Sequence, residues 1–373
     1  MKDIFSKTLL TAFSVAALVS CKKDPIEPVK LPELPSYSVP TTYDFGTSTS
    51  YKPSENRINM LKEFIAYIRS AHTSTAQVTL DQNKLFSYFE NSGSPFSSAE
   101  LNSSGLSLKE KTSNQEGLLS DINIWLPEAA AASQSTAEAK DGTAGKILGP
   151  VPTNGGVRSA WLLNAYGFEF KELVEKGLMG GLMYSEATTK LHLIGTFDNS
   201  VKDEKGATAM ERAWDEAFGY FGVPAAFPTT TTGLSYWGNY CNSVNAAIGS
   251  NAAIMDAFLK GRAAISNKDY TTRDAQRDIV VTTWEKVAAA KLIAYLKQAK
   301  NNIAEAGPRS HALSEGYGFI RAFVYNPVKK ISNADIDQLL DLLGNNLYQV
   351  SATNIDQAIS KVSTVFSLDA AKL

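Results

Sequence analysis

The stretch TTRDAQRDIVVTTWEKVAAAKLIAYL, residues 271–296, decides the fold class of this 373-residue chain. Its apolar side chains recur every three or four positions, at Val280, Trp284, Val287, Ala290 and Ala294. A helix turns once every 3.6 residues, so this spacing places the five side chains on one face. The stretch therefore predicts a long helix with one buried face.

The same spacing recurs near both ends of the chain. The apolar positions are Ile58, Leu61, Ile65 and Ile68 near the start, and Ile336, Leu339, Leu340, Leu343 and Leu347 near the end. Asp81 and Ser332 stand where helix N-caps are expected. Glycine and proline clusters at 141–157 and 222–233 separate the helical stretches, and the threonine run 229–232 is predicted to be loop. No series of alternating strands stands out, so the sequence predicts an all-α, multi-helix bundle.

Two eight-residue segments share one pattern, Ala-x-x-Glu-small-aromatic-Gly-aromatic. They are AWDEAFGY at 213–220 and ALSEGYGF at 312–319, offset by 99 residues. Chance agreement and true duplication are both open interpretations. A duplication would divide the chain into two related bundle halves, at about 56–225 and 226–373.

Helical geometry places the aromatic residues of each segment in a stripe. The stripes are Trp214, Phe218 and Phe221 in one helix, and Leu313, Tyr317 and Ile320 in the other. Gly219 and Gly318 would let a neighbouring backbone approach closely, which would compensate for the cost of a helical glycine, up to about 1 kcal/mol relative to alanine. We expect the two glutamates, Glu216 and Glu315, to be partly buried.

Each of these glutamates has a basic residue one turn earlier, Arg212 before Glu216 and His311 before Glu315. One interpretation is a structural ion pair. The other is a metal or ligand site, because His and Glu four residues apart can both face one ion. His192, with Glu186 on the same predicted helix, is a further candidate ligand. The candidate metal ligands are therefore His311, Glu315, Glu216 and His192.

Other residues that carry chemistry have simpler interpretations. Tyr236, Trp237 and Tyr240 are typical of a helical core, with a sugar or haem pocket as the alternative. Cys241 is predicted to be packed rather than nucleophilic. The oxygen-rich segment 198–204 lacks the residue spacing of an EF-hand and is predicted to be a solvated loop. Zinc-protease, phosphate-loop and serine-hydrolase motifs are absent from the sequence.

The start of the chain predicts secretion and a lipid anchor. Lys2 and Lys7 precede an apolar run at 9–19, which is too short for the roughly 20 residues of a membrane span. The run ends in Leu-Val-Ser before Cys21, which resembles a bacterial lipobox. Residues 1–20 are predicted to be a lipoprotein signal peptide and Cys21 the lipid-modified (palmitate-bearing) first residue, with an ordinary cleaved signal as the alternative.

The segment after Cys21 is predicted to be a tether. Five prolines between 22 and 40 favour an extended, unpacked chain. The boundaries expected are a lipidated tether at 21–55 and an all-helical domain at 56–373, with residues 22–50 open to protease. Cys-Lys-Lys-Asp resembles the start of Bacteroidota outer-membrane lipoproteins, which implies an outer-membrane location on its periplasmic or cell-surface face.

Charge and cysteine content exclude some functions. Residues 1–20 hold two lysines and one aspartate, and the rest of the chain carries 34 basic against 37 acidic side chains, a net charge of −3. Such a balance gives no reason to expect nucleic-acid binding or a polybasic membrane patch. Only Cys241 follows Cys21, so an intramolecular disulfide is excluded once Cys21 is lipidated, and a large core must supply the stability.

The chain resembles the imelysin-like proteins, and more closely an uncharacterised group of Bacteroidota lipoproteins. The residues that carry this resemblance are the lipobox and the segments 214–222 and 311–323. Imelysins look like iron-regulated envelope proteins that were once classed as metallopeptidases. Their Gly-x-His-x-x-Glu motif is not reproduced here, and only its histidine has a direct match, at His311. Gly307 lies four residues before it instead of two, and Glu315 stands one place after the position of the motif glutamate, which Ser314 occupies.

The resemblance implies an envelope-anchored, non-enzymatic binding protein for iron, haem or another nutrient, acting beside an outer-membrane transporter. The first alternative is an imelysin-type metal-dependent hydrolase. The second is a structural or adhesive surface lipoprotein. The cofactors to be considered are iron or another divalent metal, and haem.

Overall fold

The computed structural model describes residues 36–73, 77–149 and 160–373, and it confirms the all-α prediction. Residues 1–20, Cys21 and the first part of the tether lie outside these ranges. The helices are α1 (Lys52–Arg69), α2 (Gln82–Glu90), α3 (Ala99–Ser103), α4 (Leu118–Gln134), α5 (Phe170–Leu178), α6 (Ser185–His192), α7 (Ala209–Phe221), α8 (Trp237–Ile248), α9 (Ser250–Ser266), α10 (Tyr270–Asn301), α11 (Ala306–Ala322), α12 (Asn333–Leu343) and α13 (Ala352–Phe366). None of the helices in the described ranges has the length and apolarity needed to cross a membrane.

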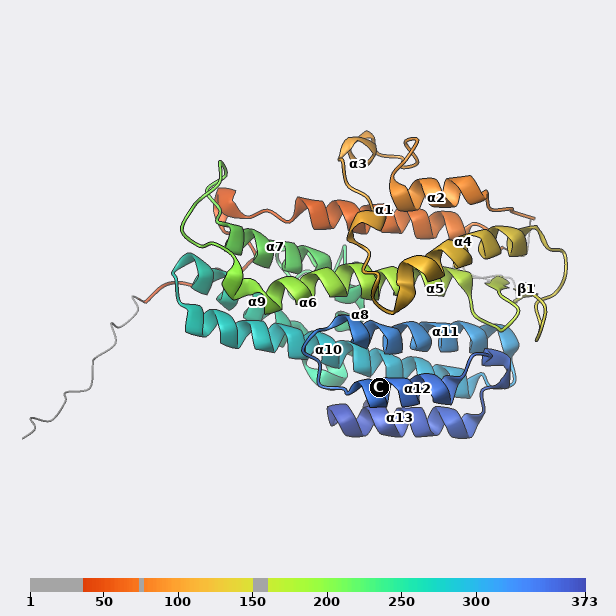
Figure 1. Cartoon of the computed structure of the whole chain (residues 1–373). Coiled ribbons are helices and arrows are strands. Elements are labelled where there is room, and N and C mark those ends of the chain that lie inside the picture. Colours follow the sequence, from red (N-terminus) through yellow and green to blue (C-terminus); the bar gives the residue numbers. More distant parts are fainter. Residues whose placement is uncertain (1–35, 74–76, 150–159) are drawn as a thin grey trace, which may run out of the picture. The chain divides into compact units, whose positions relative to one another are not determined.

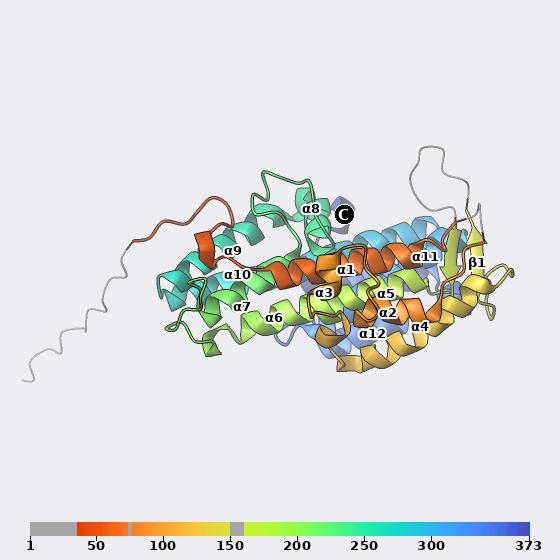
Figure 2. The ribbon, with the colours of Figure 1, turned by 90° about the horizontal axis from the view of Figure 1, so that it is seen from above.

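Helix α10 is the long helix that the sequence predicts, and it runs along the bundle beside α9 and α11 (Figure 1 and Figure 2). It packs against α8, α9, α11 and α13. Four of its five predicted core positions are fully buried, and Ala294 is half-buried. The bundle has one large hydrophobic core that draws on every long helix, so residues 37–373 form one compact unit.

The shorter helices follow their sequence signals. The four predicted α1 positions are buried, and the Asp81 and Ser332 side chains accept hydrogen bonds from backbone N–H groups at the starts of α2 and α12. Helix α12 ends at Leu343 because Gly344 follows with a φ of 64°. Leu347 lies beyond this end in a short 3₁₀ turn, although its side chain is still buried.

One short hairpin was not predicted. Strands β1 (Gly145–Leu148) and β2 (Ala160–Leu163) pair antiparallel, with Gly145 opposite Leu163. Each strand has four residues, and β2 is buried throughout, so neither shows the alternation that identifies a half-buried strand. The predicted loop at 229–232 is confirmed, and residues 150–157 of the first glycine and proline cluster lie outside the described ranges.

The paired motif helices are α7 and α11, and their glycines have the predicted role. A Cβ atom on Gly219 would lie 2.7 Å from Cβ of Tyr51, and one on Gly318 would lie 2.2 Å from Cβ of Lys176. The predicted stripes are buried, with Tyr317 half-buried. The glycines therefore let α7 approach the start of α1 and let α11 approach α5.

Gly318→Ala is expected to lower the free energy of unfolding by about 1–3 kcal/mol, because the added methyl group must push α11 away from α5. Gly316→Ala is the matched control in the same helix. Its methyl group would lie 3.5 Å from Leu292, an ordinary contact, and alanine is favoured over glycine in a helix by about 0.5–1 kcal/mol. Urea unfolding of both variants checks the difference, and equal losses would contradict it.

From Tyr43 onward the chain before α1 is packed, although the sequence predicts an extended tether over 21–55. Tyr43 is buried and stacks on Phe218 of α7, with 3.6 Å between ring centroids. The Ser50 backbone N–H donates to the Asp215 carboxylate at 2.9 Å. The packed unit therefore begins before residue 56, and we expect protease trimming to stop before Tyr43.

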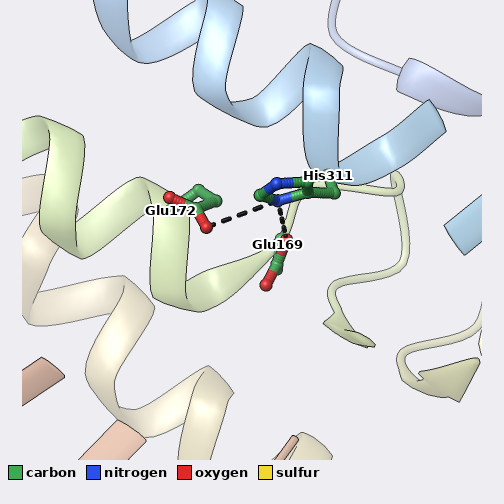
Figure 3. Close-up of side chains that lie close together, drawn as sticks. All are labelled: Glu169, Glu172 and His311. Carbon is green, nitrogen blue, oxygen red and sulfur yellow. Dashed lines mark hydrogen bonds and ion pairs between the residues drawn. The ribbon is translucent and has the colours of Figure 1, made fainter. Parts of the chain in front are cut away.

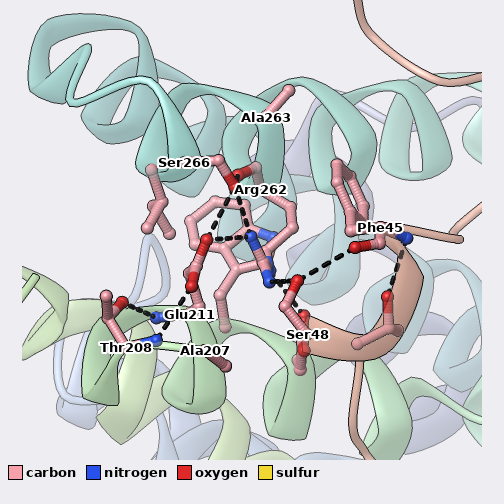
Figure 4. A network of polar contacts seen from close by, with 12 residues as sticks. Phe45, Ser48, Ala207, Thr208, Glu211, Arg262, Ala263 and Ser266 are labelled. Carbon is pink, nitrogen blue, oxygen red and sulfur yellow. Dashed lines mark hydrogen bonds and ion pairs between the residues drawn. The ribbon is translucent and has the colours of Figure 1, made fainter. Parts of the chain in front are cut away.

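A buried arginine joins this N-terminal segment to α7 and α9 (Figure 4). The Arg262 guanidinium donates from Nε to Asp215 at 2.8 Å and from Nη1 to Glu211 at 2.7 Å. It also donates from Nη2 to Ser48 Oγ at 3.1 Å. Buried charges are costly unless they are paired, and in this network the buried charges of Arg262, Asp215 and Glu211 are paired with one another.

Candidate metal and ligand site

Helix α5 carries an unusual density of buried charge. Its sequence FKELVEKGL places Lys171, Glu172, Glu175 and Lys176 on two successive turns, and Glu169 immediately precedes the helix. All five are buried, because α1, α4 and α11 cover the helix. Carboxylates at a helix N-terminus are favoured by the partial positive charge there, which suits Glu169 and Glu172.

The α5 charges neutralise one another in a compact ion-pair network. Lys171 Nζ lies 2.9 Å from Glu172 and 2.8 Å from Glu175. Lys176 Nζ lies 2.9 Å from the other Glu172 oxygen and 3.0 Å from Glu315 of α11. The absent side chain of Gly318 leaves room for Lys176 at this helix contact. Burial would lower the pKa of Lys176, but the surrounding carboxylates raise it well above its usual value.

His311 of α11 lies beside two carboxylates of this network (Figure 3). Its Nδ1 is 2.8 Å from Glu169 and 3.3 Å from Glu172, and its Nε2 is 3.9 Å from Glu315. Burial alone would lower the pKa of His311, but Glu169 and Glu172 raise it to about 9. His311 is therefore an imidazolium at neutral pH. On the far side of Glu169, His72 Nδ1 lies 3.2 Å from the second carboxylate oxygen.

Glu169, Glu172 and His311 can also serve as metal ligands. Each offers one ligand atom, and these atoms lie within 4.8 Å of one another. One imidazole nitrogen with two carboxylate oxygens suits iron, zinc or another divalent first-row metal. A metal ion at this position must displace the proton of His311, and it must compete with Lys171 and Lys176 for the carboxylate of Glu172. His72 would then hydrogen-bond a ligating carboxylate, as supporting residues of metal sites commonly do.

The network forms one wall of an open cavity of about 910 Å³. Helices α1, α5, α8, α10 and α11 contribute to the wall, together with Trp161 of β2 and the chain before α8. His311, Glu175 and Glu315 face this space. Burial and the nearby Glu172 carboxylate raise the pKa of Glu315 despite its pairing with Lys176. A large cavity with charged groups of shifted pKa is the usual form of a small-molecule site.

The aromatic cluster before and within α8 divides between core and cavity. Trp237 is fully buried in the core, as the simpler interpretation predicts, whereas Tyr236 and Tyr240 line the cavity. Tyr236 has a φ of 43° and a ψ of −108°, a conformation that is strained for a residue with a side chain. Such strain is typical of sites where the backbone is held for a function.

The four predicted metal ligands do not form one site. His311 and Glu315 line the cavity, but Glu216 pairs with Lys190 at 3.1 Å beside a separate hollow. His192 Nε2 lies 3.1 Å from the Asn326 side-chain oxygen. The expected Arg212–Glu216 pair is replaced by Arg212–Asp203 at 2.7 Å, because the loop before α7 folds back onto that helix.

Sequence reasoning missed Glu169, Glu172 and His72. For the two glutamates the available signal was the segment FEFKELVEK, 168–176, in which five charged residues are interspersed with four apolar ones that a core would bury. The other minor predictions agree with the structure. Cys241 is fully buried, and burial raises the pKa of its thiol to about 12. Asp198 and Asp203 lie in an exposed loop.

Comparison with known proteins places the chain in a family. The model of the family described as "Domain of unknown function (DUF4856)" matches residues 40–369. The match spans most of the chain, so the chain belongs to this family. Searches of curated proteins and of solved structures give no significant match.

Proposed function

We propose that this DUF4856 protein is a lipid-anchored outer-membrane protein that binds a divalent metal ion, iron foremost, and acts beside an uptake system without turning over a substrate. The observation that carries the proposal is the cluster of Glu169, Glu172 and His311, of which His311 lines an open cavity and the two glutamates lie behind it. The lipobox at Cys21 supports the anchor. The resemblance to imelysin-like proteins, matched at His311, supports an envelope role connected with iron.

The charge of the network is consistent with a divalent cation. Four carboxylates of Glu169, Glu172, Glu175 and Glu315 face two lysines and the His311 imidazolium, a net charge of −1 when all are ionised. A divalent ion in place of the His311 proton would bring this sum to zero. Buried networks are most stable when their charges balance. The two lysines on Glu172 would keep the affinity below that of a dedicated structural site.

His311→Ala is expected to weaken binding of Fe²⁺ or Zn²⁺ to the purified chain by at least about tenfold, because it removes the only nitrogen ligand of the cluster. Calorimetric titration of metal into protein treated with chelator measures this. His192→Ala is the matched control, since that imidazole is also half-buried but pairs with Asn326. Metal binding that is absent from the wild type, or equal in the two variants, would contradict the proposal.

Two further measurements test the rest of the proposal. Wild-type protein should partition into detergent, and Cys21→Ala should not, because the anchor depends on acylation of that cysteine.

An imelysin-type hydrolase would use the same metal cluster. Metal-dependent peptide hydrolysis that disappears in His311→Ala would replace the binding role with this alternative.

A further inference from the structure

The cavity has an excess of positive charge that the metal cluster does not explain. Its wall carries the cations Lys62, Arg69, Lys171 and His311, against Glu175 and Glu315. Behind the wall, Lys176 pairs with Glu172, and Glu169 pairs with His311. Without His311, the charged side chains of the wall sum to +1, because Lys62, Arg69 and Lys171 face Glu175 and Glu315. A cavity with this charge attracts anions.

The two cations at the mouth of the cavity are available for a ligand. Lys62 and Arg69 are exposed and lie seven residues apart on α1, so they stand two turns apart on one helix face. Neither forms an ion pair with another residue in the described ranges, whereas Lys171 is held by Glu172 and Glu175. An arginine and a lysine in this arrangement suit a carboxylate.

The rest of the wall offers aromatic surface and hydrogen-bond donors. Tyr236, Tyr240 and Tyr295 line the cavity, and burial raises the pKa of each phenol, so all three keep their protons at neutral pH. Trp161 also lines it. This residue is 9% exposed, and its indole N–H has no acceptor among the described residues. A buried donor without a partner is costly, and a ligand oxygen would remove that cost.

We propose that the cavity binds a small organic carboxylate with an aromatic body. Its carboxylate lies toward Arg69 and Lys62, and its body lies against the tyrosines and Trp161. This second ligand goes beyond the proposed metal binding and does not depend on it.

Three probes with one carbon skeleton test the proposal: 4-biphenylacetate, the corresponding ethylamine and the corresponding ethanol. Each is titrated calorimetrically into the full chain in the presence of chelator. The carboxylate is expected to bind at least about tenfold more tightly than the amine or the alcohol. The double variant Arg69→Gln/Lys62→Gln is expected to lose this preference for the carboxylate. Lys52→Gln is the control, because Lys52 is an exposed α1 cation paired with Glu100 outside the cavity.

Each outcome decides the question. The proposal is supported if the wild type prefers the carboxylate, the double variant loses this preference and the Lys52→Gln variant retains it. Equal affinity for the three probes, no saturable binding of the carboxylate, or an equal loss in Lys52→Gln would overturn it. Because no metal is present, a failure of metal binding in the earlier titration leaves this result unaffected.

Discussion

Arg262→Ala is expected to lower the free energy of unfolding by about 3–5 kcal/mol. The guanidinium is completely buried between Asp215 and Glu211, which are themselves 0% and 5% exposed. Its removal leaves two carboxylates inside the protein without their counter-charge. Urea unfolding followed by circular dichroism measures the loss.

Protonation of Asp215 keeps the loss of unfolding free energy in Arg262→Ala within about 3–5 kcal/mol. Burial already raises the pKa of Asp215, even though the Arg262 guanidinium lowers it. The variant can therefore neutralise Asp215 by taking up a proton. We also expect faster proteolysis near residues 43–50, because Ser48 loses its bond to the guanidinium.

Arg277→Ala on α10 is the matched control for Arg262→Ala. Arg277 pairs with Asp274 and Asp278, whose side chains are 41% and 63% exposed. Surface pairs of this kind contribute about 0–1 kcal/mol. If the two alanine variants unfolded at the same urea concentration, the buried network would not have the stabilising role assigned to it.

The parts of the fold that local sequence determines were predictable. Apolar spacing identified α1, α10 and α12, and the caps at Asp81 and Ser332 were correct. The shared glycines of α7 and α11 were correctly expected to allow close helix approach. These features depend on neighbours within one or two turns of a helix, and such neighbours are visible in one dimension.

The candidate site could be predicted only in part, because its contacts are long-range. His311 was identified, but its partner Glu169 lies 142 residues earlier in the chain. Arg212 and Glu216 are one turn apart, and each pairs instead with a residue outside α7. Local spacing shows which charges can meet on one helix. It does not show which opposing helix supplies a better partner.

The His311 imidazolium is expected to stabilise the folded protein by about 3 kcal/mol at pH 6.5 and below, and this contribution should be lost as the pH rises through 9. The ordinary pKa of histidine is 6.5, and in the folded protein the pKa is raised to about 9. Below the lower value both states are protonated, so the folded state keeps the full benefit of the two carboxylates. Above the higher value both states are neutral, and the benefit is gone.

The measurement is the difference in unfolding free energy between wild type and His311→Gln, taken at about pH 6 and pH 9.5 with a chelator present. Other groups titrate in both proteins, so the subtraction isolates His311, and the difference should shrink by about 3 kcal/mol. His192→Gln is the control with the opposite sign: burial lowers the pKa of His192, so its difference should change only below about pH 6.5. A difference for His311→Gln that stays constant between the two pH values would mean that His311 is not charged beside Glu169 and Glu172. The proton that a metal ion is proposed to displace would then be absent.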